Sequence, residues 1–399
     1  MNKIVKKCII YISIIFIGIV IFSIIIYSPE YMYRVLRYGN SDVNDYRIFS
    51  ARIIEHSTQP YYYVENILDD LKNQLVSYKS KGKDNKKDLK CFLEDTNTTA
   101  FIVIHNDKIV FEQYINGYSR DSINTSFSSV KSIVSLLIGI AIDEGYIESE
   151  EQSIVEYIYE FKDTPMEKIK IKDLLMMRSE IKYEEGRLWF SDDAKTYYWP
   201  DLRELAVKHI KIDTKYNGDF HYNNYHPLLL GIILERSTGQ SVANFLEEKI
   251  WKKIGTEYNA SWSLDSKESG FEKMESGLNF RSIDIAKIGT MLLNNGHWNG
   301  EKIVSKKWIK KSIIPQMPIN YQEYNETWLE NKGVVYQYMW YILKNKKGGY
   351  DYYAAGKYGQ YLYLSPQNNI LIVRNGINTG EVDWWPGVLE QITDIIAEI

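Results

Sequence analysis

Ser128 and Lys131 are the two residues of this 399-residue sequence whose types and spacing point most directly to chemistry. Residues three apart share one face of a helix, so a lysine amine there can take the proton of a serine hydroxyl, which is otherwise a weak nucleophile. The apolar run SIVSLLIGIAI after Lys131 predicts a buried helix, in which loss of water would lower the pKa of the amine. The pair therefore predicts nucleophilic catalysis by Ser128 with Lys131 as its base.

The same Ser-x-x-Lys spacing occurs at two other places, Ser80 to Lys83 and Ser179 to Lys182. Only Ser128 opens a buried helix, whose N-terminal N–H groups and dipole favour developing negative charge. A purely structural interpretation also fits this pair, with Ser128 as a helix cap and Lys131 extending to water. The catalytic interpretation is favoured because the lysine lies at the start of an otherwise apolar helix.

Tyr222 and Asn224 lie in the polar segment FHYNNYH, about ninety residues after Ser128 and just before a second apolar run. A tyrosine can act as a general base if neighbouring cations hold it as phenolate, and an asparagine offers both a donor and an acceptor to an amide substrate. Tyr-x-Asn also occurs twice elsewhere in the sequence, so the pattern carries weight only in combination with the serine and lysine.

Lys357, Gly359 and Gln360 form a third candidate element in AAGKYGQYLYLSP, at the expected start of a strand. Glycines there would let a substrate approach the backbone, and the N–H groups could complete an oxyanion hole. The alternative is that Gly356 and Gly359 are bulge or turn glycines of an ordinary strand.

Strand patterns at both ends of the sequence and helical patterns between them must position these residues. TAFIVIHNDKIVFEQYING predicts a hairpin turning at Asn106–Asp107, a second hairpin is predicted around residues 367–369, and the chain ends in an amphipathic helical pattern. Residues 165–250 look mostly helical. We therefore expect an α/β (α+β) fold with an antiparallel sheet flanked by helices and an inserted α-helical domain around residues 150–270.

The N-terminal part of the chain contains an uncharged apolar run at residues 8–27, about the length that crosses a bilayer. Lys3, Lys6 and Lys7 precede it, so the positive-inside tendency predicts a single-pass anchor with the catalytic domain extracytoplasmic. A cleaved signal peptide is the alternative. The expected organisation is an anchor at 1–29, a juxtamembrane lead-in segment at 30–95 and the hydrolase domain at 96–399.

Composition excludes some classes of function. The formal net charge of -4 comes without a basic stripe, so nucleic acid is not an expected partner. The six histidines lack ligand spacing, so we expect neither a metal site nor a cofactor. The expected partner is a small-molecule or peptide substrate.

Taken in order, Ser128-Ser-Val-Lys131, Tyr222-Asn-Asn224 and Lys357-Tyr-Gly359 resemble the S-x-x-K, Y-x-N and K-T-G motifs of penicillin-recognising, β-lactamase-related serine hydrolases. The segments IKIKDLLMMRSE and SGLNFRSIDIAKIGTMLLNNGHWNG are similar to stretches of the same group, and the sequence looks closest to its aminohexanoate-dimer hydrolase-like branch. The likeness covers roughly residues 41–395.

The resemblance implies a β-lactamase/transpeptidase-like fold and an acyl-enzyme mechanism without metal or cofactor. It implies that Ser128 is the nucleophile, Lys131 its base and Tyr222 the proton shuttle to the leaving group. Asn224 would contact the substrate amide and Lys357 would stand in the third motif. The N–H groups of Ser128 and Gln360, the latter beside Gly359, would bind the oxyanion.

One departure bears on the substrate: the third motif reads K-Y-G, and tyrosine cannot place a small hydroxyl where threonine would. We therefore expect hydrolysis of a small amide, an ester or a D-amino-acid peptide. The alternatives are a cell-wall DD-peptidase or β-lactamase, and a catalytically silent protein that binds peptidoglycan or another ligand. The aromatic loops RLWFSDDAKTYYWP and EVDWWPG would either contact the substrate or close the core.

Overall fold

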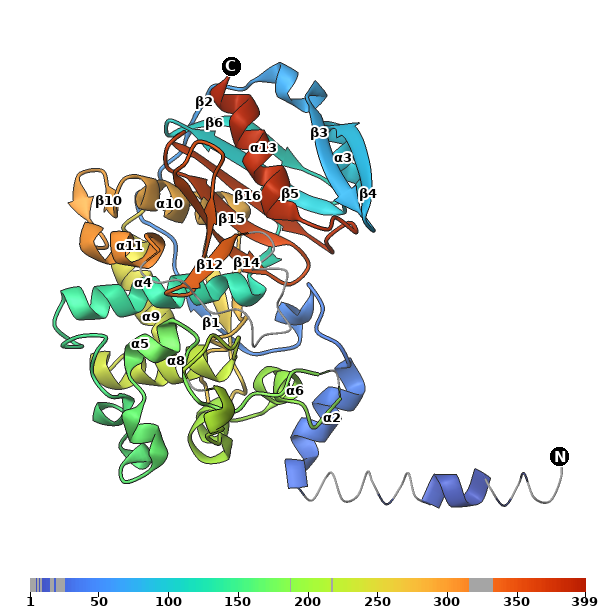
Figure 1. The fold of residues 1–399 in the computed structure, drawn as a ribbon, viewed down its shortest axis with the longest axis vertical. Coiled ribbons are helices and arrows are strands. Elements are labelled where there is room, and N and C mark those ends of the chain that lie inside the picture. The colour runs from blue at the N-terminus through green and yellow to red at the C-terminus, as the bar shows by residue number, and fades with distance from the viewer. Residues whose placement is uncertain are drawn as a thin grey trace.

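A large sheet and a helical block make up most of the computed structural model of this chain (Figure 1). The structure describes residues 26–315, apart from Arg187 and Asn217, and residues 333–399, together with residues 5, 7, 9–14 and 18. Apolar side chains from both parts are buried in one continuous core.

The main sheet has eight strands in the order β12-β13-β14-β15-β16-β5-β6-β2. Adjacent strands of this sheet pair antiparallel, except that β2 runs parallel to β6. The strands are β2 (Val64–Glu65), β5 (Thr98–His105), β6 (Lys108–Tyr114), β12 (Val334–Gln337), β13 (Trp340–Lys344), β14 (Tyr350–Gly356), β15 (Gln360–Ser365) and β16 (Ile370–Gly376). The pairing of β16 with β5 joins strands about 270 residues apart in the sequence, which confirms the predicted antiparallel sheet.

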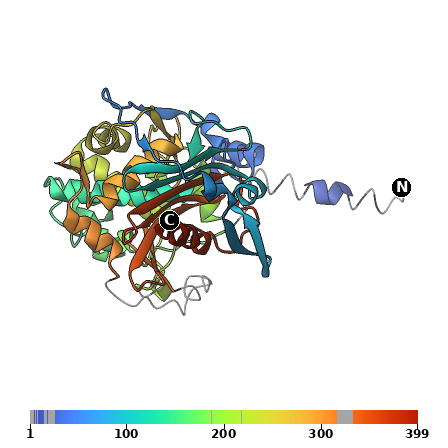
Figure 2. The ribbon, with the colours of Figure 1, turned by 90° about the horizontal axis from the view of Figure 1, so that it is seen from above.

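Two helices cover opposite faces of this sheet. Gly289 of α10 (Ser282–Leu293) packs closely against Leu362, whereas Trp385 of α13 (Trp385–Ala397) packs its ring near that of Tyr361. Tyr361 and Leu362 are adjacent in β15, and neighbouring residues of a strand point to opposite faces. The helices therefore enclose the sheet as predicted, and Figure 2 shows the dark red α13 on one side of the strands.

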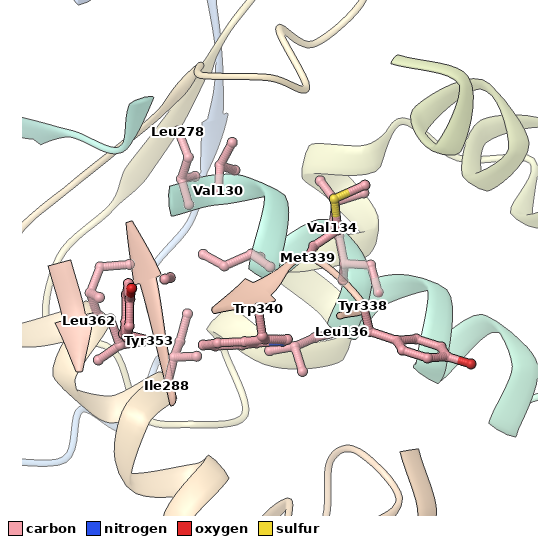
Figure 3. Packing of buried hydrophobic residues seen from close by; sticks show 14 of the residues in the cluster. Val130, Val134, Leu136, Leu278, Ile288, Tyr338, Met339, Trp340, Tyr353 and Leu362 are labelled. Carbon is pink, nitrogen blue, oxygen red and sulfur yellow. The ribbon is translucent and has the colours of Figure 1, made fainter. Parts of the chain in front are cut away.

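The helical block lies between the two halves of the sheet in the sequence. Its helices are α4 (Val130–Asp143), α5 (Ile171–Leu175), α6 (Asp192–Tyr198), α7 (Leu202–Glu204), α8 (Tyr225–Thr238) and α9 (Val242–Leu246). The α4 helix is buried along nearly its whole length because it packs on both α8 and β14. Figure 3 shows Val130 at its start beside Leu278. The division into an inserted domain and a lead-in segment remains a prediction.

A smaller sheet, in the order β1-β8-β9-β7, lies beside the start of α4. Its strands are β1 (Ala51–Ile54), β7 (Asn124–Thr125), β8 (Ala260–Ser263) and β9 (Leu278–Phe280). Because β7 ends just before Ser128 and β9 pairs with it, this sheet brings residues near 278 next to the candidate nucleophile.

The lysine-rich stretch at 79–90, for which the sequence pattern predicted no strand, completes a hairpin of β3 (Leu75–Ser80) and β4 (Lys83–Asp88) and begins α3 (Leu89–Asp95). Lys81 and Gly82 both have positive φ, 50° and 74°, as a two-residue hairpin turn requires. The strand was missed because β4 exposes nearly all its side chains, so it shows no apolar alternation.

The predicted localisation in a membrane is wrong. No helix in the part of the chain that the structure describes is long and apolar enough to cross a membrane. Residues 8, 15–17 and 19–25 of the predicted span lie outside the described residues. The sequence argument relied on apolar composition, whereas a crossing requires about 20 apolar residues in one helix. The extracytoplasmic placement depended on that span and falls with it.

Candidate active site

Lys131 and Ser128 meet at the start of α4, as their spacing predicts. The Lys131 amine donates to Ser128 Oγ at 2.8 Å and to the backbone carbonyl of Glu275 at 3.0 Å. The short 3-10 helix η3 (Phe127–Ser129) carries the serine into α4, so the two side chains lie one helical turn apart. The lysine is therefore directed at the serine hydroxyl and does not extend to water.

Burial changes the acid–base behaviour of this lysine. Lys131 is only 1% exposed, and loss of water lowers the pKa of its amine to about 7. The carboxylates of Glu275 and Asp193 oppose this shift because negative charge favours the protonated amine. Near neutral pH a substantial fraction of the amine is neutral and can accept a proton.

The segment before the candidate nucleophile Ser128 is held in a strained conformation. Phe127 has a φ of 44°, a left-handed conformation that is uncommon for a residue with a side chain. Ser126, which precedes it, donates its N–H to the carbonyl of Leu278 and its hydroxyl to that of Ser276. The Phe127 ring also packs edge-on against that of Tyr358, with 5.2 Å between centroids. These contacts fix the backbone that presents Ser128.

Tyr222 lies in the loop before α8, and its ring faces the lysine. The Lys131 amine is 5.0 Å from the centre of the Tyr222 ring. The Tyr222 ring also packs edge-on against Tyr336 of β12. The structure thus brings the second predicted motif to the serine–lysine pair, although ninety residues separate them in the sequence.

Asn224, at the start of α8, ends a hydrogen-bonded chain with a defined direction. The Tyr183 hydroxyl donates to Asp193 Oδ1 at 2.5 Å, so its oxygen accepts from Asn224 Nδ2 at 2.7 Å. The backbone N–H of Gly186 donates to the other oxygen of Asp193. Within the described chain, Asn224 Oδ1 is left buried without a hydrogen-bond partner. This series of hydrogen bonds therefore uses the Asn224 amide as a donor and leaves its Oδ1 acceptor unused.

The third motif forms the turn between β14 and β15. The Lys357 amine donates to Ser41 Oγ at 2.7 Å, and the Tyr358 hydroxyl donates to the Ser41 carbonyl at 2.5 Å. Gly359 has a φ of 79°, a left-handed backbone conformation that glycine adopts easily because it has no side chain. Gln360 begins β15 with its side chain buried. The roles of Lys357, Gly359 and Gln360 toward a substrate remain predictions.

This turn packs on the segment that leads to Ser128. A Cβ atom on Gly356 would lie 2.2 Å from the carbonyl oxygen of Ser126 and 3.2 Å from Phe127 Cβ. Only glycine permits so close an approach of the two backbones. The first and third motifs are therefore neighbours in space.

The other two Ser-x-x-Lys patterns do not form such a pair. Ser80 and Lys83 are cross-strand partners at the end of the β3–β4 hairpin. Ser179 is buried against His226, with 2.5 Å between Oγ and Nε2, while the Lys182 amine pairs with Glu184. The local conformation therefore separates these patterns from the one at Ser128.

Several residues of the site were not identified from the sequence. Glu275 contributes a backbone carbonyl, for which no sequence signal exists. Tyr183 and Asp193 fix Asn224, and Asp193 lies within the aromatic loop that was expected either to contact a substrate or to close the core. In the second aromatic loop Trp385 is 2% exposed and belongs to the core.

A groove of about 720 Å³ lies away from these motifs, between the β3–β4 hairpin and the start of α13. Tyr78, Trp384 and Val388 form part of its wall, which includes neither Ser128 nor Lys131. The candidate site is therefore identified by the geometry of its reactive groups and not by the size of a hollow.

Comparison with known proteins identifies the family and the fold. The chain matches the Beta-lactamase family over residues 87–375. It is 25% identical over 299 residues to the 6-aminohexanoate-dimer hydrolase of Paenarthrobacter ureafaciens, which covers 72% of this chain and 74% of that protein.

Solved structures share the fold. A Bacillus anthracis protein provisionally named a 6-aminohexanoate-dimer hydrolase superposes with a TM-score of 0.74 at 24% identity, over 91% of this chain and 94% of its own. A class C β-lactamase superposes with a TM-score of 0.56 at 13% identity, over 77% and 93%. These comparisons confirm the predicted β-lactamase-like fold and the resemblance to this family. The chain belongs to the Beta-lactamase family and is a serine hydrolase.

Proposed function

We propose that this protein cleaves an amide or ester bond through an acyl-enzyme on Ser128. The observation that carries the proposal is the 2.8 Å contact between the Lys131 amine and Ser128 Oγ, made by a buried lysine whose pKa is about 7. A cap serine beside a solvated lysine would show neither feature. The two groups suit a nucleophile and its general base.

In the proposed first step, the neutral Lys131 amine takes the hydroxyl proton as Ser128 Oγ attacks the substrate carbonyl carbon. The N–H groups of Ser128 and Gln360 bind the oxyanion that forms. The C–N or C–O bond then breaks, and the proton taken up by Lys131 passes through Tyr222 to the departing amine or alcohol. Water hydrolyses the acyl-enzyme in the second step and returns Ser128 to its starting state.

A small amide is the substrate class that we favour. Asn224 Oδ1 is an unused acceptor, which would suit the N–H of an amide and has no counterpart in an ester. The name of the Paenarthrobacter relative, a 6-aminohexanoate-dimer hydrolase, points to the same class. The K-Y-G sequence of the third motif argues against recognition of a β-lactam carboxylate, because it lacks the small hydroxyl of threonine.

Covalent labelling tests the proposed function. The purified full chain should react with a fluorophosphonate at Ser128, Ser128→Ala should abolish the label, and Ser179→Ala should retain it. Labelling that survives Ser128→Ala would contradict the proposal. A fluorescent penicillin, used in parallel, separates the alternatives: labelling by both probes would favour a DD-peptidase or β-lactamase, and labelling by neither a silent binding protein.

Substrate class is tested with 6-aminohexanoate dimer and a p-nitrophenyl ester. Asn224→Ala should lower kcat/KM for the amide about tenfold or more and change that for the ester much less, because only the amide offers the N–H. Equal losses for the two substrates would remove Asn224 as an amide contact while leaving the acyl-enzyme proposal intact.

A further inference from the structure

Arg374 is a fully buried cation on β16 whose five N–H groups are all used. Its Nη1 donates to the carbonyls of Tyr358 and Gly359 at 2.9 and 2.7 Å. Its Nη2 donates to the carbonyls of Thr96 and Asn378, and its Nε donates to Thr98 Oγ1. Every partner is a neutral oxygen.

Such an arrangement is costly, because a buried charge is normally balanced by an opposite charge. The guanidinium lies over the ring of Trp385, with 4.3 Å between its central carbon and the ring centre. Burial lowers the pKa of Arg374 to about 9, which leaves the group charged at neutral pH. Among the residues that the structure describes, Arg374 has no acidic partner, and a cation kept there calls for an explanation beyond packing.

The backbone around Arg374 is shaped to admit it. A Cβ atom on Gly359 would lie 2.0 Å from Arg374 Nη1, and one on Gly376 would lie 2.3 Å from the same atom. Two glycines thus leave the space that the guanidinium occupies. One of them belongs to the third motif.

The contact with the Gly359 carbonyl determines the direction of the next N–H group. The Gly359–Gln360 peptide bond is trans, and in a trans peptide the C=O and N–H bonds point in opposite directions. Because Arg374 holds the carbonyl, the Gln360 N–H points away from the guanidinium. The same turn contacts the nucleophile segment through Gly356, which packs on Ser126 and Phe127.

We propose that Arg374 is a positioning residue that fixes the Gly359–Gln360 peptide so that the Gln360 N–H is held toward the oxyanion. This inference rests on the proposed function, which makes that N–H an oxyanion donor. A cation bonded to the carbonyl also withdraws electron density from the peptide, so the N–H becomes a stronger donor. The arginine would act through the peptide without touching the substrate.

The test compares p-nitrophenyl acetate with its thiono analogue, in which sulfur replaces the carbonyl oxygen. Sulfur is a poor hydrogen-bond acceptor, so a donor to the oxyanion contributes less to the thiono reaction. Arg374→Met should lower kcat/KM for the oxygen ester by about 100-fold and that for the thiono ester by about threefold or less. Arg374→Lys should shift the ratio in the same direction by a smaller factor.

Ile372→Ala on the same strand is the matched control, because it shortens a fully buried side chain that lies opposite Tyr363 and not at the turn. It should lower Tm and leave the ratio of the two esters unchanged. If neither arginine variant folds, Gly376→Ala provides a substitute, because its added methyl group would press on the guanidinium while Arg374 is retained. It should lower kcat/KM for the oxygen ester more than that for the thiono ester. Equal losses for both esters in the folded variants would overturn the proposal.

Failure of the proposed function gives a different result. Wild-type turnover of the oxygen ester that disappears in Ser128→Ala supports that function. Its absence would overturn both proposals, because no oxyanion would form for the peptide to bind. Wild-type turnover with equal losses in the Arg374 variants would overturn the positioning role alone.

Discussion

Two regions of this protein carry the same Ser-x-x-Lys spacing and use it in opposite ways. At Ser128 the spacing falls on a helix, and the buried lysine amine contacts the serine hydroxyl. At Ser179 the serine is buried against His226, while the Lys182 amine turns to Glu184 near the surface. Identical residue types thus give a hydrogen-bonded serine–lysine pair in one region and two unrelated contacts in the other.

The difference lies in the backbone. Ser128 leads directly into the 14-residue helix α4, where a separation of three places side chains on one face. Ser179 follows the end of α5, and Ile181 after it forms a β-bridge with Ile212. In extended backbone, side chains alternate between opposite sides, so residues three apart point away from one another. Spacing therefore has a chemical meaning only once the local conformation is known.

The first prediction tests this difference by replacing each of the three serines with alanine. Ser128→Ala should abolish turnover, because loss of the nucleophile removes the covalent path. Ser179→Ala and Ser80→Ala should keep turnover within about twofold of wild type, since neither hydroxyl meets a lysine. Steady-state kinetics with one ester substrate measure all three. A loss from Ser179→Ala equal to that from Ser128→Ala would move the active site.

The second prediction concerns Tyr222, whose ring lies 5.0 Å from the Lys131 amine. No such role is proposed for any tyrosine near Ser179. Tyr222→Phe should slow acylation by roughly 100-fold or more, because it removes the proposed proton shuttle. Lys131→Ala combined with it should cost much less than the product of the two single losses, since both act on one proton path. Multiplicative losses in this double-mutant cycle would contradict a shared relay.

The third prediction uses pH to separate the two lysines. The acylation rate should rise with pH through about 7 as Lys131 loses its proton, because the neutral amine is the base. Asp193→Asn should move this midpoint to lower pH, since the carboxylate raises the pKa of Lys131. Glu184→Gln, which alters only the partner of Lys182, should leave it unchanged. An upward shift or no shift in Asp193→Asn would contradict the assignment.

The fourth prediction concerns the stability that the Ser179 region provides. Burial lowers the pKa of His226 to about 3, below its usual value of about 6.5 in an unfolded chain. The unfolded state binds the extra proton first, so this stability is complete above about pH 6.5 and is lost as the pH falls toward 3. The contribution of His226 to the free energy of unfolding, measured in urea, should be about 2 kcal/mol smaller at pH 5 than at pH 7. A His226→Gln variant with the same pH dependence as wild type would contradict it.

The last prediction concerns the folding free energies of the two other serine variants. Ser179→Ala leaves His226 without its partner inside the core and should cost about 1–3 kcal/mol. Ser80→Ala lies at the end of a surface hairpin and should change the free energy of unfolding by no more than about 0.5 kcal/mol. Urea unfolding of both variants at pH 7 measures the difference. Equal costs would mean that burial of Ser179 contributes nothing.

Local sequence was sufficient for the elements whose signals lie within a few residues. The hairpin at Asn106–Asp107 was predictable because both residues tolerate the positive φ of 51° and 60° that they adopt. Gly239 ends α8 in the left-handed conformation for the same reason. The β3–β4 hairpin was missed, because its charged strand carries no alternation of apolar residues.

The contact between Ser128 and Lys131 could be predicted from the sequence, since the helix periodicity that joins them is a local property. The tertiary structure alone decided what surrounds that pair: the Glu275 carbonyl on the lysine, the chain from Asp193 to Asn224, and Arg374 beneath the third-motif turn. Those contacts join residues far apart in the chain, and some use backbone atoms that every residue has. A pattern of side chains in the sequence could not predict these contacts, because only packing brings the segments together.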